Sequence, residues 1–453
     1  MSDWKQQLEE IVAPAVARSR HVDEIVVDRG ALARTAEVFG RNFADVKKAY
    51  LVADENTFGV AGGEVEDRLT AAGVSVETLI LPAAPRPKPT RELAEEIRQA
   101  WQAAAPEAVP VAVGSGVVND LVKYGAFFEN RPYLCVATAA SMDGYASSGS
   151  PLVDQGFKQT IECVPPRAIV ADLDIIVDAP AEMTGWGFGD LAGKVPAGAD
   201  WMLADALGIE SIDDVAWPLV QTPLRGWLAQ AGGLKTGDAG ATAGLFAGLT
   251  VTGLAMEFYR SSRPASGADH QIAHIWEMEN HHHRGERVSH GACVALGCMT
   301  VLAYFDWLLE RDLSQLDIEA ALAARPHPEV TRSAVRRVFP DTAVAAKALA
   351  ETEAKTLTPA AHAERLKQIV ALWPALRPRL QQQVMPAEEM RALLIAAGAP
   401  TRATDIGITG EHLRATVERA RFLRRRYTVL DLLADTGLLE SATEAVFADG
   451  KLH

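Results

Sequence analysis

The sequence predicts an α/β domain with a parallel sheet over residues 1–180, followed by an all-helical domain over residues 181–453. Up to about residue 180, short apolar, β-branched runs alternate with helix-like stretches, which is typical of a parallel sheet covered by helices. After residue 180 the strand signals fade, and Ala, Leu, Glu and Arg recur at helical spacing. A chain of 453 residues with 48% hydrophobic and 23% charged residues contains enough apolar material for two large cores. Collagen-like, low-complexity and disordered chains are excluded.

In the first half, the apolar runs that end in turn residues predict strands over 49–57, 74–82, 109–116 and 133–141. Charged, alanine-rich stretches between them predict exposed helices over 63–72 and 90–105. Residues 82–90 contain four prolines in nine positions and therefore form a loop. Ligands of such a sheet bind outside the carboxyl ends of its strands.

In the second half, prolines predict breaks between helices at 217–226, 325–330 and 371–378. Residues 239–256 are uncharged over 18 positions, which is the minimum length of a membrane span. Gly, Ala and Thr dominate this segment and make it weakly apolar, so we expect a buried, closely packed helix and no membrane span.

The charge and the cysteines indicate the compartment and the kinds of partner. With 44 Lys and Arg against 59 Asp and Glu, the net charge is −15, which repels nucleic-acid phosphates and anionic lipids. The four cysteines form no C-x-x-C pair, and the first ten residues lack the basic and apolar regions of an export signal. We therefore expect a cytoplasmic protein that does not bind nucleic acid.

Gly114, Ser115 and Gly116 follow an apolar strand and open a helix. Glycines there let the backbone approach a pyrophosphate, to which the helix N-terminus offers free N–H groups. The third glycine of the common dinucleotide fingerprint is missing, so an ordinary strand–helix turn remains the alternative. Asp54 ends an earlier strand, where a carboxylate would accept from ribose hydroxyls and favour NAD over NADP. A carboxylate that caps a turn is the alternative for Asp54.

Six of the 11 histidines lie between residues 270 and 290. His270 and His274 are four residues apart and share one helix face, whereas His290 starts another apolar helix. Two imidazoles from different helices and one carboxylate make a three-ligand metal site with open positions. The best carboxylate is Asp190, which follows a glycine-rich turn at a predicted helix start. The run 281–283 is expected to be a solvated loop.

Residues 141–150 (SMDGYASSGS) follow the strand predicted at 133–141. Ser, Asp and Gly at this place are typical of a plain turn, and also of a polar substrate site at the carboxyl edge of a sheet. The chain has neither a G-x-S-x-G elbow nor a P-loop, which argues against serine hydrolases and P-loop enzymes.

These motifs together closely resemble those of bacterial-type sn-glycerol-1-phosphate dehydrogenases, which belong to the iron-containing alcohol dehydrogenase and dehydroquinate synthase-like superfamily. The resemblance covers about residues 50–309 and rests on GSGVVND, ATAASMDGYAS, PPRAIVADLDIIVDAPAEM, GWGFGDLAGK, DW, SRPASGADHQIAHIWEM and SHGACVALG. It implies a dehydroquinate synthase-like fold with a Rossmann-like nucleotide-binding domain and a helical domain, and a metal between them. It also implies a homodimer that reduces dihydroxyacetone phosphate to glycerol 1-phosphate with NAD, or alternatively NADP, as cofactor.

Carried over residue by residue, the resemblance implies that Asp190, His270 and His290 hold one divalent metal, which could be zinc, nickel or iron. It places His274 and Asp143 at the substrate as the catalytic residues. Lys194, or alternatively Lys158, would bind the substrate phosphate. The residues implied along the nucleotide are Asp54, Gly114, Ser115, Gly116, Asn119, Asp120, Thr138 and Ser141. The histidine-rich stretch 279–287 departs from the pattern of these enzymes.

Three alternative functions remain at this point. A dehydrogenase of another polyol or sugar alcohol would need the same metal and cofactor residues. A dehydroquinate synthase-like lyase is less favoured, because those enzymes usually have Glu where Asp190 stands. A non-catalytic metal-binding protein would not need the Gly114–Gly116 turn together with Asp54.

Overall fold

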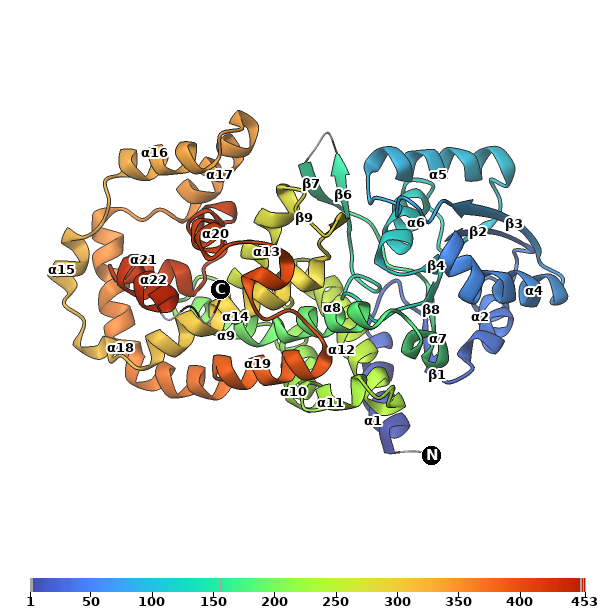
Figure 1. Cartoon of the computed structure of the whole chain (residues 1–453), viewed down its shortest axis with the longest axis horizontal. Helices are drawn as coiled ribbons and strands as arrows, with labels where there is room; N and C mark the ends of the chain where they lie inside the picture. Colours follow the sequence, from blue (N-terminus) through green and yellow to red (C-terminus); the bar gives the residue numbers. More distant parts are fainter. Residues whose placement is uncertain (1–2, 155–156, 449, 451, 453) are drawn as a thin grey trace. The chain divides into compact units, whose positions relative to one another are not determined.

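The computed structural model describes residues 3–154, 157–448, 450 and 452, and the chain forms two compact units (Figure 1). Unit 1 comprises Met1–Leu191, Pro218–Ser261 and Ala396–Gly398, and unit 2 comprises Ala192–Trp217, Ser262–Ile395 and Ala399–His453. Unit 1 therefore includes a helical segment beyond residue 180. The boundary at residue 180 marks the change in secondary structure and stays a prediction as a domain boundary.

Unit 1 is built on a six-stranded parallel sheet with the order β1-β8-β5-β4-β2-β3. Its strands are β1 (Glu24–Asp28), β2 (Lys48–Asp54), β3 (Ser75–Leu81), β4 (Val109–Gly114), β5 (Leu134–Ala137) and β8 (Ala168–Asp172). The four predicted strands are confirmed as β2, β3, β4 and β5, whereas β1 and β8 were not predicted. A separate antiparallel hairpin consists of β6 (Ser150–Asp154) and β7 (Phe157–Ile161).

The helices before, between and after these strands are α1 (Asp3–Val16), η1 (Ala31–Arg34), α2 (Thr35–Asn42), α3 (Glu55–Thr57), η2 (Phe58–Gly62), α4 (Gly63–Ala71), α5 (Arg91–Ala104), α6 (Gly116–Phe128), α7 (Leu173–Val177), α8 (Ala181–Ala192), α10 (Ala216–Leu228), α11 (Ala231–Leu234) and α12 (Ala239–Tyr259). The predicted helices at 63–72 and 90–105 are confirmed as α4 and α5. The Thr90 side chain accepts a hydrogen bond from the Leu93 N–H at 3.2 Å and starts α5 as its N-cap.

Helices cover both faces of the sheet. Alternate residues of β2, namely Ala49, Leu51 and Ala53, pack in one core with Phe39 of α2 and Leu69 of α4. The intervening residues of β2 are also buried, on the side where α5 packs on α6 (Figure 1). Burial of both faces explains the continuous apolar runs in the sequence.

The uncharged segment 239–256 is α12, a buried helix as expected. Among the residues that the structure describes, two helices, α12 and α14 (His290–Leu309), are long and apolar enough to cross a membrane by length and composition. In both, 83% of the apolar window is buried within the protein. Core helices of soluble proteins have the same character, so these two helices are weak evidence for a membrane span.

Unit 2 is predominantly helical. Its elements are α9 (Lys194–Ala206), α13 (Ala268–Met278), α14, η3 (Leu313–Gln315), α15 (Ile318–Ala323), α16 (Pro328–Val338), α17 (Thr342–Lys355), α18 (Pro359–Gln383), α19 (Ala387–Ala397), η4 (Ala403–Ile406), α20 (Gly410–Leu423), α21 (Val429–Asp435) and α22 (Leu439–Ala448). A two-residue hairpin of β9 (His282–His283) and β10 (Glu286–Arg287) connects α13 to α14.

Only one of the three predicted proline breaks is confirmed. At 325–330 the chain passes from α15 to α16, and Pro328 occupies the first turn of α16. The breaks predicted at 217–226 and 371–378 are wrong, because α10 and α18 run through them. In α18 the neighbouring Trp373 and Leu376 are buried, so tertiary packing holds the helix despite the backbone N–H groups that proline lacks.

Candidate active site

The carboxyl ends of β2 and β4 form the predicted nucleotide edge of unit 1. Val52 pairs with Ala112, which brings Asp54 and Gly114 to the same level of neighbouring strands. A Cβ at Gly114 would lie 2.8 Å from the Cβ of Val118, and one at Gly116 would lie 3.0 Å from the Met142 side chain. A side chain at Gly114 would therefore clash with Val118, and one at Gly116 would have to displace the flexible Met142 side chain. Because α6 begins at Gly116, its free N–H groups face this edge, as a pyrophosphate site requires.

Asp54 also serves the local structure. Its Oδ1 accepts the Thr57 N–H at 2.8 Å, and the Thr57 hydroxyl accepts the Asp54 N–H at 3.0 Å. This capping box starts α3 and corresponds to the alternative role considered for Asp54. A carboxylate has a second oxygen, so capping and ribose binding are compatible.

Two residues of the predicted nucleotide site have partners within unit 1. Asn119 is fully buried, and its Oδ1 accepts from the Tyr133 hydroxyl at 3.0 Å. The Asp120 Oδ1 lies 3.3 Å from the ammonium of buried Lys123. Direct contact of Asn119 and Asp120 with a nucleotide stays a prediction.

After β5, the segment from Thr138 to Gly149 is irregular but largely buried, and we call it the 138–149 loop. It contains Thr138, Ser141 and Asp143, whose exposed fractions are 6%, 8% and 8%. The Asp143 N–H donates to Asp190 Oδ2 at 2.9 Å. The structure thus brings together a predicted substrate residue and a predicted metal ligand of unit 1.

The glycine-rich stretch before Asp190 is not a turn, and the predicted helix start there is wrong. Asp190 lies in the last turn of α8, which includes Gly185, Gly187 and Gly189. A Cβ at Gly187 would lie 1.9 Å from the carbonyl oxygen of Ala140 in the 138–149 loop. The glycine therefore permits close contact between α8 and this loop.

The predicted histidines of unit 2 come together where α13 packs on α14. The ring centroids are 5.3 Å apart for His270 and His290, 6.1 Å for His270 and His274, and 6.0 Å for His274 and His290. A Cβ at Gly297 of α14 would lie 2.3 Å from the carbonyl oxygen of Asp269 in α13. Gly297 thus lets the two helices approach closely enough to form the histidine cluster.

A buried carboxylate orients each of the two predicted imidazole ligands. His270 Nδ1 lies 2.6 Å from Asp269 Oδ2, and His290 Nδ1 lies 2.9 Å from Glu277 Oε1. A carboxylate at Nδ1 favours the tautomer whose Nε2 is available to a metal, and it raises the basicity of the ligand. Asp269 and Glu277 were not predicted from the sequence, although Asp269 directly precedes His270 and Glu277 follows His274 by three residues.

His274 extends the same cluster. Its Nε2 lies 3.9 Å from Glu277 Oε2, and donor atoms of His274, Glu277 and His290 all lie within 4.8 Å of one another. The side chains of His274 and His290 are 25% and 26% exposed, whereas His270 is buried. The position of His274 suits a residue that meets a substrate.

Asp200 of α9 fixes the N-terminus of α13, two residues before His270. Its Oδ2 accepts the Ala268 N–H at 2.8 Å and its Oδ1 accepts the Val429 N–H at 2.7 Å, so one carboxylate binds the first N–H groups of two helices. Burial raises the pKa of Asp200 to about 7, while these hydrogen bonds and the charge of Arg263 act in the opposite direction. Asp200 belongs to the DW motif, to which the sequence analysis assigned no role.

Lys194 and, as the alternative, Lys158 are the lysines predicted at the substrate phosphate. Lys194 is fully buried at the start of α9. Burial raises the pKa of Cys298 well above its usual value and Lys194 lowers it, so the ammonium acts electrostatically on that thiol. The side chain of Lys158 lies outside the described residues.

The histidine run 281–283 is not a solvated loop throughout, so that expectation is corrected. His282 is exposed, but His281 Nε2 lies 2.7 Å from the carbonyl oxygen of Ile406. His283 lies so close to Gly407 that a Cβ there would be 2.2 Å from the imidazole Nδ1. These contacts attach the hairpin between α13 and α14 to η4.

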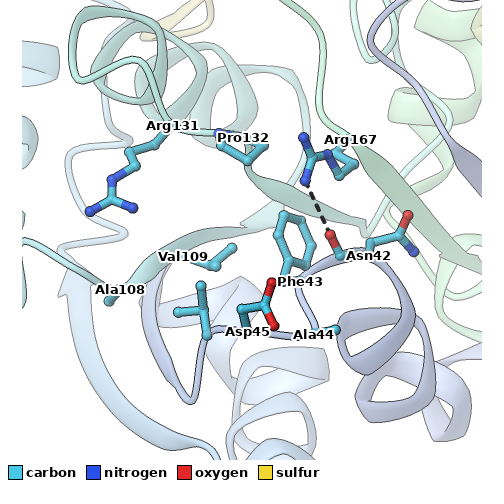
Figure 2. A pocket seen from close by; sticks show the side chains of 10 residues that line it. Asn42, Phe43, Ala44, Asp45, Ala108, Val109, Arg131, Pro132 and Arg167 are labelled. Atoms are coloured by element: carbon cyan, nitrogen blue, oxygen red, sulfur yellow. Dashed lines mark hydrogen bonds between the residues drawn. The ribbon is translucent and has the colours of Figure 1, made fainter.

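A cavity of about 150 Å³ opens at the amino ends of the sheet strands (Figure 2). Its two arginines already bind backbone carbonyls: Arg167 donates to Asn42 and Arg131 donates to Pro106, both at 3.2 Å. The cavity lies at the edge opposite Asp54 and Gly114, and we do not assign it to the active site.

Comparison with known proteins identifies the family of this chain. The model of the iron-containing alcohol dehydrogenase family matches residues 26–180. A glycerol-1-phosphate dehydrogenase [NAD(P)+] from Bacillus subtilis (strain 168) is 34% identical over 281 residues, which are 62% of this chain and 70% of that protein. The chain belongs to the glycerol-1-phosphate dehydrogenase family. Another member, from Thermofilum pendens (strain DSM 2475 / Hrk 5), is 33% identical over 296 residues, covering 64% of this chain and 80% of that protein.

Solved structures confirm the predicted fold of this glycerol-1-phosphate dehydrogenase family member. The crystal structure of glycerol dehydrogenase from Schizosaccharomyces pombe has a TM-score of 0.59 at 16% identity and covers 94% of this chain and 90% of that chain. At this identity the similarity shows the fold alone. It is the predicted α/β domain with a parallel sheet, followed by a helical domain.

Proposed function

We propose that this chain is a metal-dependent dehydrogenase that reduces dihydroxyacetone phosphate to sn-glycerol 1-phosphate with NADH or NADPH, and that also catalyses the reverse reaction. The observation that carries the proposal is the His270–His290 pair, whose Nδ1 atoms are oriented by Asp269 and Glu277. The names of its relatives, glycerol-1-phosphate dehydrogenase [NAD(P)+], support the substrate and the cofactor.

The donor set fits a divalent metal. His270 and His290 would each provide Nε2, and Asp190 would provide the carboxylate. Zinc, nickel and iron all accept two imidazoles and one carboxylate. When bound, the metal supplies a Lewis acid that stabilises negative charge on the reacting carbonyl oxygen.

The residues of unit 1 would bind the nucleotide. Gly114 and Gly116 leave room for the pyrophosphate at the start of α6, and Asp54 would accept from the adenosine ribose. Thr138 and Ser141 would line the nucleotide at the carboxyl end of β5. A nicotinamide held along this edge supplies the hydride.

Residues other than the metal ligands and the nucleotide-binding residues would bind the substrate and transfer the proton. Asp143 would bind a substrate hydroxyl, and Lys194 would bind the phosphate. His274 would donate the proton to the carbonyl oxygen, since it is the partly exposed imidazole of the cluster that is not assigned to the metal.

We also propose a homodimer in the cytoplasm that binds neither nucleic acid nor membrane. The dimer rests on the resemblance to the family. Four buried cysteines support the compartment, and the net charge of −15 supports the lack of anionic partners.

The substrate assignment is tested with dihydroxyacetone phosphate beside unphosphorylated dihydroxyacetone, with the metal-loaded enzyme and NADH. We expect kcat/KM to be at least about 100-fold higher for the phosphorylated ketone, because a site built for a polar group discriminates strongly against an analogue without it. Equal values would instead support a dehydrogenase of other polyols, the second candidate.

Asp54→Ala is expected to weaken the preference for NADH over NADPH by about tenfold, because the carboxylate repels a 2′-phosphate. The measurement is kcat/KM with each cofactor. Thr57→Ala is the matched control, since it removes the hydroxyl of the capping box and keeps the carboxylate. Each variant should lose about 1 kcal/mol of stability through the cap. Equal use of both cofactors by the wild type, or the same shift in Thr57→Ala, would contradict this role of Asp54.

A further inference from the structure

The 138–149 loop has no helix or strand to satisfy its backbone, although most of its residues are buried. Buried carbonyl groups need partners, and a buried irregular segment must find them outside regular secondary structure. Two glycines bring other elements close to this loop. Besides Gly187 of α8, a Cβ at Gly253 of α12 would lie 2.8 Å from the carbonyl oxygen of Asp143. The loop is therefore packed between helices on either side of the predicted substrate residue.

Lys123 of α6 supplies the partners for two carbonyls of this loop. Its Nζ donates to the carbonyl oxygen of Gly144 at 2.8 Å and to that of Gly149 at 3.1 Å. Its third neighbour is Asp120 Oδ1 at 3.3 Å. The three N–H donors of the ammonium thus have three acceptors, and Lys123 is completely buried.

A buried ammonium is costly, because burial removes its hydration and well-packed apolar residues would often give equal or greater stability. Stability alone is therefore a weak reason for a lysine here. What the ammonium provides is a fixed position for two carbonyls. Gly144 follows Asp143 directly, and the N–H of Asp143 is bound to Asp190. The backbone around Asp143 is thus bound by Lys123 at the Gly144 carbonyl and by Asp190 at the Asp143 N–H.

We propose that Lys123 is a positioning residue that sets the place of Asp143 through the 138–149 loop. The role in catalysis rests on the proposed function, whereas the role in ordering the loop does not. Lys123 touches neither substrate nor cofactor in this account. Its loss should reduce the reaction of bound substrate more than it changes binding of the nucleotide to the start of α6.

The test compares the wild type with Lys123→Met, which keeps the length of the side chain and removes the charge. Three quantities are measured on the metal-loaded full chain: amide hydrogen exchange of peptides within 140–150, the Kd of NADH, and kcat and KM for dihydroxyacetone phosphate. We expect faster exchange in these peptides, at least a tenfold lower kcat/KM, and less than a threefold change in Kd. Lys123→Gln, which retains one donor group, should be intermediate and serves as the test if Lys123→Met does not fold.

Arg98→Met is the matched control. Arg98 is paired with Glu95 and Glu129, so this variant also removes a cation in contact with α6 but leaves the 138–149 loop intact. It should change none of the three quantities beyond about twofold. Unchanged exchange, or faster exchange with unchanged kcat/KM, would overturn the proposal. If the wild type itself does not reduce dihydroxyacetone phosphate, the proposed function fails, and exchange still decides whether Lys123 orders the loop.

Discussion

His290→Ala is expected to lose the bound metal and to lower kcat/KM for dihydroxyacetone phosphate by at least about 1000-fold, because it removes a ligand and the charge stabilisation that the metal supplies. The ring centroids of His290 and His270 are 5.3 Å apart. His290 lies on α14, whereas His270 and His274 both lie on α13. Metal content by elemental analysis and steady-state kinetics are the two measurements.

Two further variants separate a metal ligand from a histidine of the same segment. His282→Ala changes an exposed side chain of the histidine run and should leave metal content and activity unchanged. Glu277→Gln keeps the side-chain size next to His290 Nδ1 and removes the charge, which should weaken metal affinity by about 10- to 100-fold. A His290→Ala protein with full metal content would contradict the assignment of His290 as a ligand.

Gly297→Ala is expected to destabilise the protein by about 3 kcal/mol, because overpacking of a dense core forces side chains and backbone apart. The added methyl carbon would lie 2.3 Å from the carbonyl oxygen of Asp269. Since this contact sets the approach of α14 to α13, the variant should also bind metal less tightly. Chemical denaturation of the metal-free protein measures the first effect, and metal titration measures the second.

Gly40→Ala in α2 is the control for the glycine itself, since a Cβ there would meet nothing within 4 Å. Alanine in a helix interior at an open position is stabilising by roughly 0.5–1 kcal/mol. If Gly297→Ala behaved like Gly40→Ala, close packing of α14 on Asp269 would not be what brings the histidines together.

The sheet was predictable where strands are long and end in turn residues, as with β2 and β4. Strands β1 and β8 escaped prediction because their apolar runs, residues 25–27 and 168–171, have only three and four residues and are flanked by charged residues on both sides. Proline was a misleading signal in α10 and α18. Proline in a helix interior always removes one backbone hydrogen bond and crowds the preceding turn. Whether the helix nevertheless forms depends on its packing against residues from elsewhere in the chain.

The site was predictable in its histidines, because six within 21 positions stand out by composition. The residues that orient them were not. Asp269 and Glu277 resemble ordinary helix carboxylates until the packing of α13 on α14 shows what they touch. The roles of Lys123 and Asp200 are harder to predict, because both side chains bind backbone groups that are remote in sequence. Lys123 binds the Gly144 carbonyl, and Asp200 binds the Val429 N–H.

The dependence of the reaction on a metal held by Asp190 is tested by NADH oxidation with dihydroxyacetone phosphate. The protein is stripped of metal and reloaded separately with zinc, nickel and iron, and Asp190→Ala is measured beside it. An increase in melting temperature with NADH shows independently that the cofactor binds each preparation. We expect no turnover without metal, turnover with at least one of the three ions, and none in Asp190→Ala. Full activity of the stripped wild type, or of Asp190→Ala, would contradict a metal-dependent dehydrogenase with Asp190 as a ligand.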